Sequence, residues 1–246
     1  MFKQFFCFTV LIISLIGLCS NSLANLSQIK IVTAPEVKYM RDNEDVLLVH
    51  TLSRIEYEIH HIPGSIHIAS TDVKSSKKMP KDKKKAIVFY CNGVKCPYSK
   101  RASDAAIKMG YQNIFWFKGG IPEWIRFHYK MNNNKMLKKV KIKKLRPSKF
   151  QAKMNKDRPF MLDVRPIKWN IEPAYIENSV FIPLLHLHEK FQSIPKTRKI
   201  LIADGFMKQS SAAAKFLTYK GYDVLGVLKG GIVRWKKEGY PVVVPK

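Results

Sequence analysis

The sequence is short of acidic residues, and this shortage dominates its charge. Only 18 aspartates and glutamates stand against 44 lysines and arginines, so the formal net charge is +26. Such a surplus favours an anionic partner, which could be nucleic acid, an acidic membrane surface or a small anion. With 46% hydrophobic and 25% charged residues the composition is otherwise globular, and 246 residues suffice for two small domains with separate cores.

The apolar run over residues 5–18 is too short for a comfortable transmembrane span. It follows the single charge of Lys3, and residues 22–24 place small side chains at the two positions that a signal peptidase reads. This pattern predicts a signal peptide over residues 1–24, cleaved after Ala24, and therefore a periplasmic, secreted protein. Retention of the leader as an anchor is the alternative, and a membrane partner is expected only in that case.

Cysteine is also scarce, with four in the chain. Cleavage of the leader removes Cys7 and Cys19 and leaves only Cys91 and Cys96. A secreted protein held together by disulfides carries more pairs, spread along its length. Two cysteines close together in one loop point instead to chemistry, redox sensitivity or metal binding.

The chain contains an internal repeat. Residues 118–124 (Lys-Gly-Gly-Ile-Pro-Glu-Trp) return at 229–235 as Lys-Gly-Gly-Ile-Val-Arg-Trp, and a Gly-Tyr pair precedes each segment. Ser99 lies 11 residues before the glycine of the first Gly-Tyr pair, and Ser210 lies 11 residues before the second. Self-similarity over this length indicates a domain duplication rather than a short solenoid repeat.

Each copy alternates apolar runs with helix-compatible stretches. This alternation predicts two domains, each a mostly parallel sheet flanked by helices. Ser99 and Ser210 are expected to cap the helices that they open, and both helices end at glycine. The predicted boundaries are 25–133 for the first domain, 134–147 for a basic linker and 148–246 for the second. The expected strands are residues 46–49, 86–90 and 113–117, then 160–162, 199–203 and 223–228; the expected helices are 99–109 and 210–219.

The copies differ at the end of one strand, where the first has Cys91 and the second has Asp204. A side chain at the carboxyl end of a parallel strand, before a loop that enters a helix, lies where α/β folds bind ligands. Backbone N–H groups and the helix N-terminus there favour a thiolate, the nucleophilic form of cysteine. Cys91 is therefore the candidate nucleophile.

These motifs resemble the rhodanese family over residues 28–128 and 145–243. The resemblance rests on the segments at 90–93, 110–111 and 118–124, on His-Ile-Pro-Gly-Ser-Ile at 61–66, and on Leu-Asp-Val-Arg at 162–165. It implies a sulfurtransferase, in which a loop cysteine accepts sulfane sulfur from a donor such as thiosulfate and passes it to a thiophilic acceptor. The first domain alone is expected to be active, because a carboxylate at position 204 cannot carry sulfur.

The first copy departs from the family pattern in three ways. His50 and Leu52 stand where the family usually has Asp and Arg, the loop after Cys91 is two residues longer than usual, and it contains no arginine. A phosphatase function is disfavoured, because Pro97 stands where a phosphatase needs an arginine to bind phosphate. Cys96 remains open as a second candidate nucleophile, or as a thiol that resolves a persulfide or forms a disulfide with Cys91.

The predicted function is periplasmic transfer of sulfane sulfur through a persulfide on Cys91, without a metal or other cofactor. The expected partners are a small anionic sulfur donor and a thiophilic acceptor or acceptor protein, and no nucleic acid. The alternative is a non-catalytic thiol-redox or partner-binding module with a Cys91–Cys96 disulfide. The histidines are expected to make local hydrogen bonds rather than to bind metal. The residues expected to bind the donor are Asn92, Gly93, Val94, Lys95, Cys96, Ser99 and Arg101.

Overall fold

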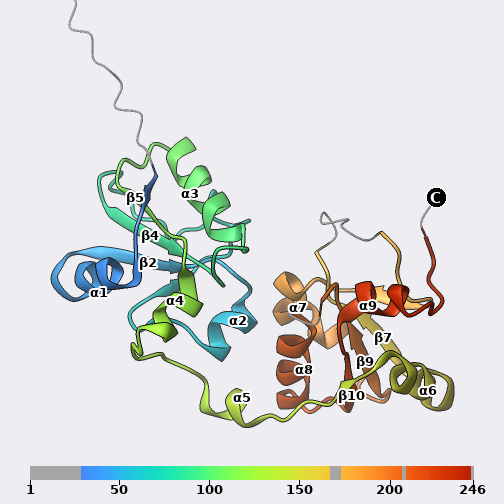
Figure 1. Ribbon diagram of the computed structural model, residues 1–246. Coiled ribbons are helices and arrows are strands. Elements are labelled where there is room, and N and C mark those ends of the chain that lie inside the picture. Colours follow the sequence, from blue (N-terminus) through green and yellow to red (C-terminus); the bar gives the residue numbers. More distant parts are fainter. Residues whose placement is uncertain (1–28, 167–172, 207–208, 245–246) are drawn as a thin grey trace, which may run out of the picture.

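The computed structural model describes residues 29–166, 173–206 and 209–244. These residues form two separate α/β units that lie side by side (Figure 1). The predicted leader over residues 1–24 lies outside the described residues. Among the residues that are described, no helix has the length and apolar character needed to cross a membrane.

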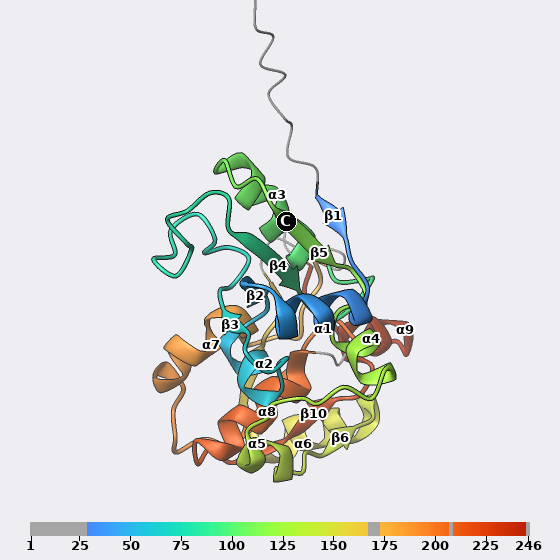
Figure 2. The same ribbon diagram turned by 90° about the vertical axis from the view of Figure 1, so that its left-hand side faces the viewer.

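The first unit is built on a five-stranded sheet with the order β1-β5-β4-β2-β3. Every neighbouring pair of strands runs parallel. Its strands are β1 (Lys30–Ile31), β2 (Val46–His50), β3 (Ile66–His67), β4 (Ala86–Tyr90) and β5 (Ile114–Phe117), and its helices are α1 (Ala34–Asn43), α2 (Arg54–Ile59), α3 (Tyr98–Lys108) and α4 (Gly120–Arg126). The helices α1 and α4 lie together on one side of the sheet (Figure 2).

The second unit repeats this arrangement in the parallel order β6-β10-β9-β7-β8. The two sheets confirm the predicted fold class of two tandem α/β domains. The strand β6 comes from within residues 134–147, the predicted linker, which also contains α5 (Lys135–Lys139). The other elements are β6 (Lys144–Leu145), α6 (Pro147–Asp157), β7 (Phe160–Asp163), β8 (Ser179–Phe181), α7 (Leu184–Lys190), η1 (Phe191–Ser193), β9 (Ile200–Ala203), α8 (Gln209–Tyr219), β10 (Val224–Leu228) and α9 (Gly231–Lys237).

The prediction that Ser99 caps its helix is wrong. The helix α3 begins at Tyr98, its N-cap is Pro97, and no side chain makes a capping hydrogen bond. Ser99 lies inside the first turn, where its buried hydroxyl points to other groups described below. In the second unit α8 begins at Gln209, so Ser210 is likewise inside the helix rather than before it.

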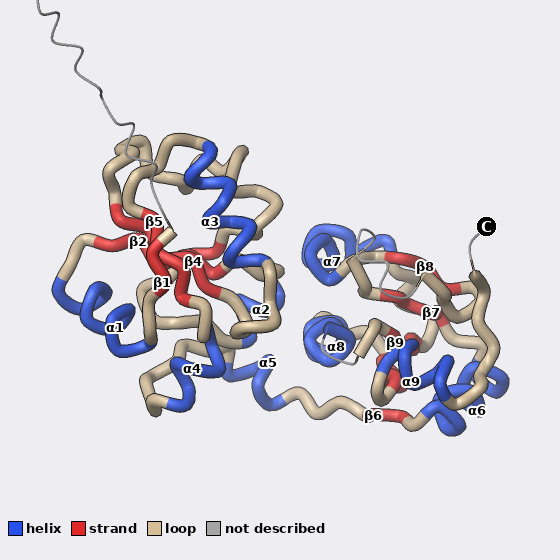
Figure 3. Tube along the Cα trace, turned by 45° about the horizontal axis from the view of Figure 1, so that its top comes forward, coloured by secondary structure: helices blue, strands red, loops and turns tan. Residues whose placement is uncertain are grey.

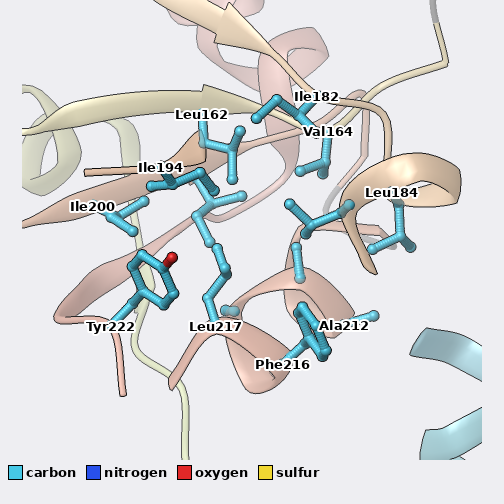
Figure 4. Packing of buried hydrophobic residues seen from close by; sticks show 14 of the residues in the cluster. Leu162, Val164, Ile182, Leu184, Ile194, Ile200, Ala212, Phe216, Leu217 and Tyr222 are labelled. Atoms are coloured by element: carbon cyan, nitrogen blue, oxygen red, sulfur yellow. The ribbon is translucent and has the colours of Figure 1, made fainter. Parts of the chain in front are cut away.

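Alternate residues of the strands form hydrophobic cores on both faces of each sheet, as a period of two requires. In the first unit, Val88 packs toward α1 and α4, whereas Phe89 packs toward α3. In the second unit, the helix α8 supplies Phe216 and Leu217 to the core over β7 and β9 (Figure 4). This last core also includes Ile55, which comes from α2 of the first unit and is fully buried.

The two units contact each other through helices. The helix α2 of the first unit packs against α7 and α8 of the second unit, and α5, which lies between the units in sequence, packs against α8. Figures 1 and 3 both show α2 facing these helices across the boundary. At the edge of this contact, His188 Nε2 lies 3.7 Å from Glu58 Oε1, and both side chains are partly exposed. At this boundary, residues that follow the central strands β4 and β9 line one cavity.

Candidate functional site

Cys91 directly follows β4, the central strand of the first sheet, and is fully buried. Asp204 follows β9, the central strand of the second sheet, and is also buried. The backbone of each residue accepts a hydrogen bond from the first turn of the equivalent helix, α4 in the first unit and α9 in the second. Ile121 N–H donates to the Cys91 carbonyl at 3.0 Å, and Ile232 N–H donates to the Asp204 carbonyl at 2.8 Å. The cysteine of one copy and the aspartate of the other are thus structurally equivalent.

The repeated Gly-Gly pair makes this packing possible. Gly120 has a φ of +54° and Gly231 has a φ of +64°. A Cβ atom at Gly120 would collide with the carbonyl oxygen of Cys91, and a Cβ atom at Gly231 would collide with the backbone of Gly205. Glycine is required at both positions for the loop to lie against the helix, which explains why the motif survives in both copies.

Hydrogen-bonding groups surround the Cys91 sulfur. Its Sγ lies 3.1 Å from Ser99 Oγ and 3.4 Å from the carbonyl oxygen of Cys96, to which the thiol donates. Trp116 Nε1–H donates to the same Ser99 oxygen at 2.9 Å. Because the indole already occupies the oxygen as an acceptor, the hydroxyl hydrogen of Ser99 is free to point at the sulfur. Ser99 is therefore a donor poised to stabilise a thiolate.

The pKa values of the two thiols, Cys91 and Cys96, are shifted in opposite directions. The side chain of Cys96 hydrogen-bonds to Cys91 and is the largest influence that lowers the pKa of Cys91, to about 7. Burial opposes this effect, and the hydroxyl of Ser99 and the backbone N–H groups of Ser99 and Asn92 add to it. The hydrogen bond to Cys91 and burial raise the pKa of Cys96. When the pair loses one proton, the negative charge therefore lies on Cys91 and the remaining proton on Cys96.

The remaining residues predicted for the site occupy different environments. Gly93 is buried with a φ of +92°, and its carbonyl accepts from the N–H of Cys96 at 2.9 Å. That N–H is thus committed within the loop, and only some of the expected amides reach the sulfur. Asn92, Val94 and Lys95 are exposed. Arg101 lies on the exposed side of α3, one residue after Lys100, whose charge is paired with Asp104 at 2.5 Å.

A cavity of about 280 Å³ lies between the two units, beside the Cys91 loop. Cys96 contributes to its wall, whereas Cys91 lies directly behind that wall. Half of the lining comes from the second unit, which the sequence prediction did not include in the site. The lining residues are Leu52, Glu56, Asn92, Lys95, Cys96, Pro97, Tyr98, Arg165, Pro166, Asp204, Gly205, Phe206, Gln209 and Val233. The Leu-Asp-Val-Arg motif at 162–165 was the available signal for one of them.

Two buried carboxylates of the second unit, Asp163 and Asp204, are held by hydrogen bonds within that unit. The carboxylate of Asp204 accepts hydrogen bonds from Gln209 N–H at 2.6 Å and from Ser210 N–H at 2.8 Å. It thereby caps α8 and occupies the position of the Cys91 thiol. The buried carboxylate of Asp163 binds the guanidinium of Arg165, with Nη2 to Oδ2 at 2.7 Å and Nε to both oxygens. This bidentate geometry holds the arginine against the edge of the cavity.

His50 occupies the strand end in the first unit that Asp163 occupies in the second. It is fully buried, and neither ring nitrogen has a hydrogen-bond partner. The rings of Tyr57, His67 and Tyr90 surround it. Burial and the nearby histidines lower its pKa well below the ordinary value. Other histidines make local hydrogen bonds, such as His67 Nε2 with the Leu52 carbonyl at 2.8 Å.

Comparison with known proteins finds the same duplication. The family model described as Rhodanese-like domain matches residues 33–127 and again residues 146–238. A tRNA uridine(34) hydroxylase from Yersinia enterocolitica is 33% identical over 99 residues, which are 38% of this chain and 27% of that protein. A protein of the same name from Photorhabdus laumondii is 31% identical with the same coverage. The chain thus spans about a quarter of the length of these relatives.

Solved structures with similarity include a rhodanese-related protein from Thermoplasma volcanium and a thiosulfate sulfurtransferase from Pseudomonas aeruginosa. The first is 28% identical with a TM-score of 0.38, and the match covers 42% of this chain and 99% of that one. The second is 12% identical with a TM-score of 0.42, and the match covers 89% of this chain and 44% of that one. The family is identified by the family model, which matches the chain twice, and not by these two solved structures.

Proposed function

Because the chain belongs to the family of rhodanese-like domains, we propose that its first domain is a sulfurtransferase that carries sulfane sulfur on Cys91. One observation supports this proposal above the others. Cys91 is the residue at the carboxyl end of the central strand, and Ser99, Cys96 and two backbone N–H groups are placed to stabilise its thiolate. A thiolate is the form of cysteine that attacks sulfur.

The proposed reaction consists of two displacements at sulfur. The Cys91 thiolate attacks the outer sulfur of a donor such as thiosulfate, the donor S–S bond breaks, and sulfite leaves with the bonding electrons. The resulting persulfide anion on Cys91 is one atom longer and still lies near the hydroxyl of Ser99 and the thiol of Cys96. A thiophilic acceptor then attacks the outer sulfur, and Cys91 leaves again as the thiolate that these donors stabilise.

The second domain has no nucleophile at the matching position, because the Asp204 carboxylate caps α8 there. We therefore assign catalysis to the first domain only. The periplasmic location follows from the sequence pattern of residues 1–24 and is part of this proposal, with membrane contact only if the leader is retained. The proposal includes no nucleic-acid partner, because the lysine runs at 74–85 and 135–149 carry no interleaved aromatics and no nucleic-acid motif.

The test is the intact mass of the purified protein after incubation with thiosulfate, followed by peptide mapping. We expect a gain of one sulfur atom on the peptide that contains Cys91, and no gain in the Cys91→Ser variant. Cys96→Ser is the matched control and is expected to keep most of the transfer, because its hydroxyl still donates to Cys91. Sulfur found only on Cys96, or activity lost only in Cys96→Ser, would overturn the assignment of Cys91.

The contact between the two thiols also favours a second candidate function, a redox module with a Cys91–Cys96 disulfide. Both cysteines are free in the structure. A thiol count on the protein before and after reduction distinguishes the candidates. A pair that is persistently oxidised, and that shows no sulfur transfer once reduced, would support the redox module and contradict the sulfurtransferase.

A further inference from the structure

The hydroxyl group of Ser99 connects Cys91 to a third side chain, the indole of Trp116. The indole Nε1–H donates to Ser99 Oγ at 2.9 Å, and the same oxygen lies 3.1 Å from Cys91 Sγ. The three side chains therefore form a hydrogen-bonded series that begins at the indole and ends at the reacting sulfur.

The register of the sheet explains why Trp116 reaches this serine. Trp116 on β5 is paired with Phe89 on β4, two residues before Cys91. Residues paired in this way point to the same face of the sheet, and Phe89 packs toward α3, the helix that contains Ser99. The carbonyl of Trp116 also accepts from the N–H of Val32 at 3.1 Å. Backbone contacts on both sides of β5 thus hold the indole in place.

The indole fixes the direction of the Ser99 hydroxyl hydrogen. An indole N–H can only donate, so it occupies a lone pair of the hydroxyl oxygen, and the hydrogen of that hydroxyl points elsewhere. The Cys91 thiol donates to the Cys96 carbonyl at 3.4 Å, which leaves its sulfur as the acceptor of the Ser99 hydrogen. A hydroxyl that accepts one hydrogen bond is also polarised into a stronger donor of the next.

The second copy shows the same serine without a thiol beside it. Ser210 is the equivalent of Ser99, and Val227 is the equivalent of Trp116, three residues before the Gly-Gly pair and paired with the strand that leads to Asp204. Ser210 is fully buried, and its hydroxyl has no hydrogen-bond partner among the described residues. The indole is therefore present in the copy that has the cysteine and is replaced by an aliphatic side chain in the copy that has the carboxylate.

We propose that Trp116 is a positioning residue for the sulfur chemistry of Cys91, and that it acts by orienting the Ser99 hydroxyl. This role deepens the sulfurtransferase function above and rests on it. In the second displacement the acceptor attacks the outer sulfur, the bond to Cys91 Sγ breaks, and Cys91 leaves as a thiolate. A thiolate that is better stabilised leaves faster, so the indole speeds the release of the carried sulfur through the serine that lies between them.

The experiment compares the unchanged protein with Trp116→Phe, which keeps an aromatic ring and removes the N–H group. The alkylation rate of Cys91 by iodoacetamide is measured across pH by mass spectrometry, and trypsin places the two cysteines on separate peptides by cutting after Lys95. We expect the midpoint of Cys91 to rise by about half a pH unit, because the indole acts through one intervening hydrogen bond. Trp124→Phe is the matched control, since its indole donates to the Lys130 carbonyl at 2.9 Å within the core on the opposite face of the sheet. It should leave the midpoint unchanged.

A double variant separates positioning from a structural effect. In a Ser99→Ala background the intervening hydroxyl is absent, so Trp116→Phe should not change the midpoint of Cys91 further. Cys91 is also loaded with sulfur from inorganic polysulfide and unloaded with 2-mercaptoethanol in single turnovers, at a pH above both midpoints. Trp116→Phe should slow the unloading but not the loading, because a less stabilised thiolate is a poorer leaving group and no poorer a nucleophile.

A measurement on the unchanged protein covers the case in which Trp116→Phe does not fold. The NMR resonance of the Trp116 indole N–H should shift with the same midpoint as Cys91, since ionisation of the sulfur changes the hydrogen bonds of Ser99. The indole resonance of Trp124 should not follow this midpoint.

The outcomes distinguish the role of Trp116 from the function itself. An unchanged midpoint and unloading rate in Trp116→Phe, an effect of equal size in the Ser99→Ala background, or an indole resonance that does not follow Cys91 would overturn the positioning role and leave the sulfurtransferase intact. Failure of polysulfide to load Cys91 in the unchanged protein would overturn the sulfurtransferase, and with it the role of Trp116 in sulfur release.

Discussion

At the scale of single residues, the two copies solve the same local problem with different anions. The strand end in each copy faces the start of a helix, where N–H groups lack partners and favour negative charge. In the second copy the Asp204 carboxylate satisfies two of these groups permanently. In the first copy the Cys91 sulfur can be neutral or negative, and it can form a bond to another sulfur. The change from carboxylate to thiol thus converts a structural cap into a reactive group.

The first residue-scale prediction concerns the titration of Cys91. Because the side chain of Cys96 is the largest influence that lowers the pKa of Cys91, Cys96→Ala should raise that pKa toward the ordinary thiol value of about 8.5. Cys96→Ser should raise it less, since the hydroxyl still donates. The ultraviolet absorbance of the thiolate, taken as the difference from the Cys91→Ser protein, measures it. A midpoint in the unchanged protein at or above the ordinary value would show that the loop does not activate its thiol.

The second prediction concerns His50. Its folded-state pKa is lowered by burial and by His67, His60 and His61, so the unfolded chain binds the extra proton first as the pH falls. Stability is therefore complete above the unfolded value of about 6.5 and is lost progressively below it. His50→Phe removes the titrating group, and it also removes two buried nitrogens without partners. The variant should gain about 1 kcal/mol at neutral pH and lose less stability in acid.

Urea unfolding between neutral and mildly acidic pH measures this effect. His186→Phe is the control, because His186 is exposed and its replacement should leave the acid sensitivity as it was. A pH profile of His50→Phe that coincides with that of the unchanged protein would rule out His50 as a source of acid sensitivity.

At the scale of elements, the sequence predicted where strands lie better than how helices begin. Buried central strands such as β4 and β9 are continuous apolar runs, and such runs can be recognised in the sequence without knowing which strands pair with them. The capping of α3 was mispredicted because a serine before a helix-compatible stretch usually caps it, and only the fold shows that the Ser99 hydroxyl instead contacts both Cys91 and Trp116. The orphan nitrogens of His50 likewise depend on packing that no local pattern encodes.

The element-scale prediction tests the turn that joins β5 to α4. Gly120→Ala requires a side chain at positive φ, which costs about 1–2 kcal/mol, and it also drives a Cβ atom into the Cys91 carbonyl oxygen. It should destabilise the protein by more than Gly110→Ala, where φ is +86° but no atom lies within 4 Å of the added Cβ. Chemical denaturation of both variants gives the comparison, and equal losses would show that the contact with Cys91 does not contribute.

At the scale of the whole molecule, the duplication was readable from the sequence but the joint between the copies was not. The repeat and its spacing predicted two domains of one fold. The cavity, in contrast, is made by loops of both domains that are far apart in sequence. In the sequence alone, its apolar residues cannot be told from ordinary core or loop residues. Ile55 illustrates this, because its place on a short helix suggests the core of its own domain, whereas it packs into the core of the other.

The last prediction follows from that placement. Ile55 is fully buried among residues of the second domain, so Ile55→Ala should cost about 2–4 kcal/mol, as for other buried isoleucines. The loss falls on the contact between α2 and the helices α7 and α8, and the two domains should then unfold in separate steps rather than together. Calorimetry and urea unfolding followed by two probes measure both effects. Ile125→Ala, at a residue that is 52% exposed, is the control and should change little. If Ile55→Ala keeps a single transition and its original stability, the packing of Ile55 does not hold the two domains together.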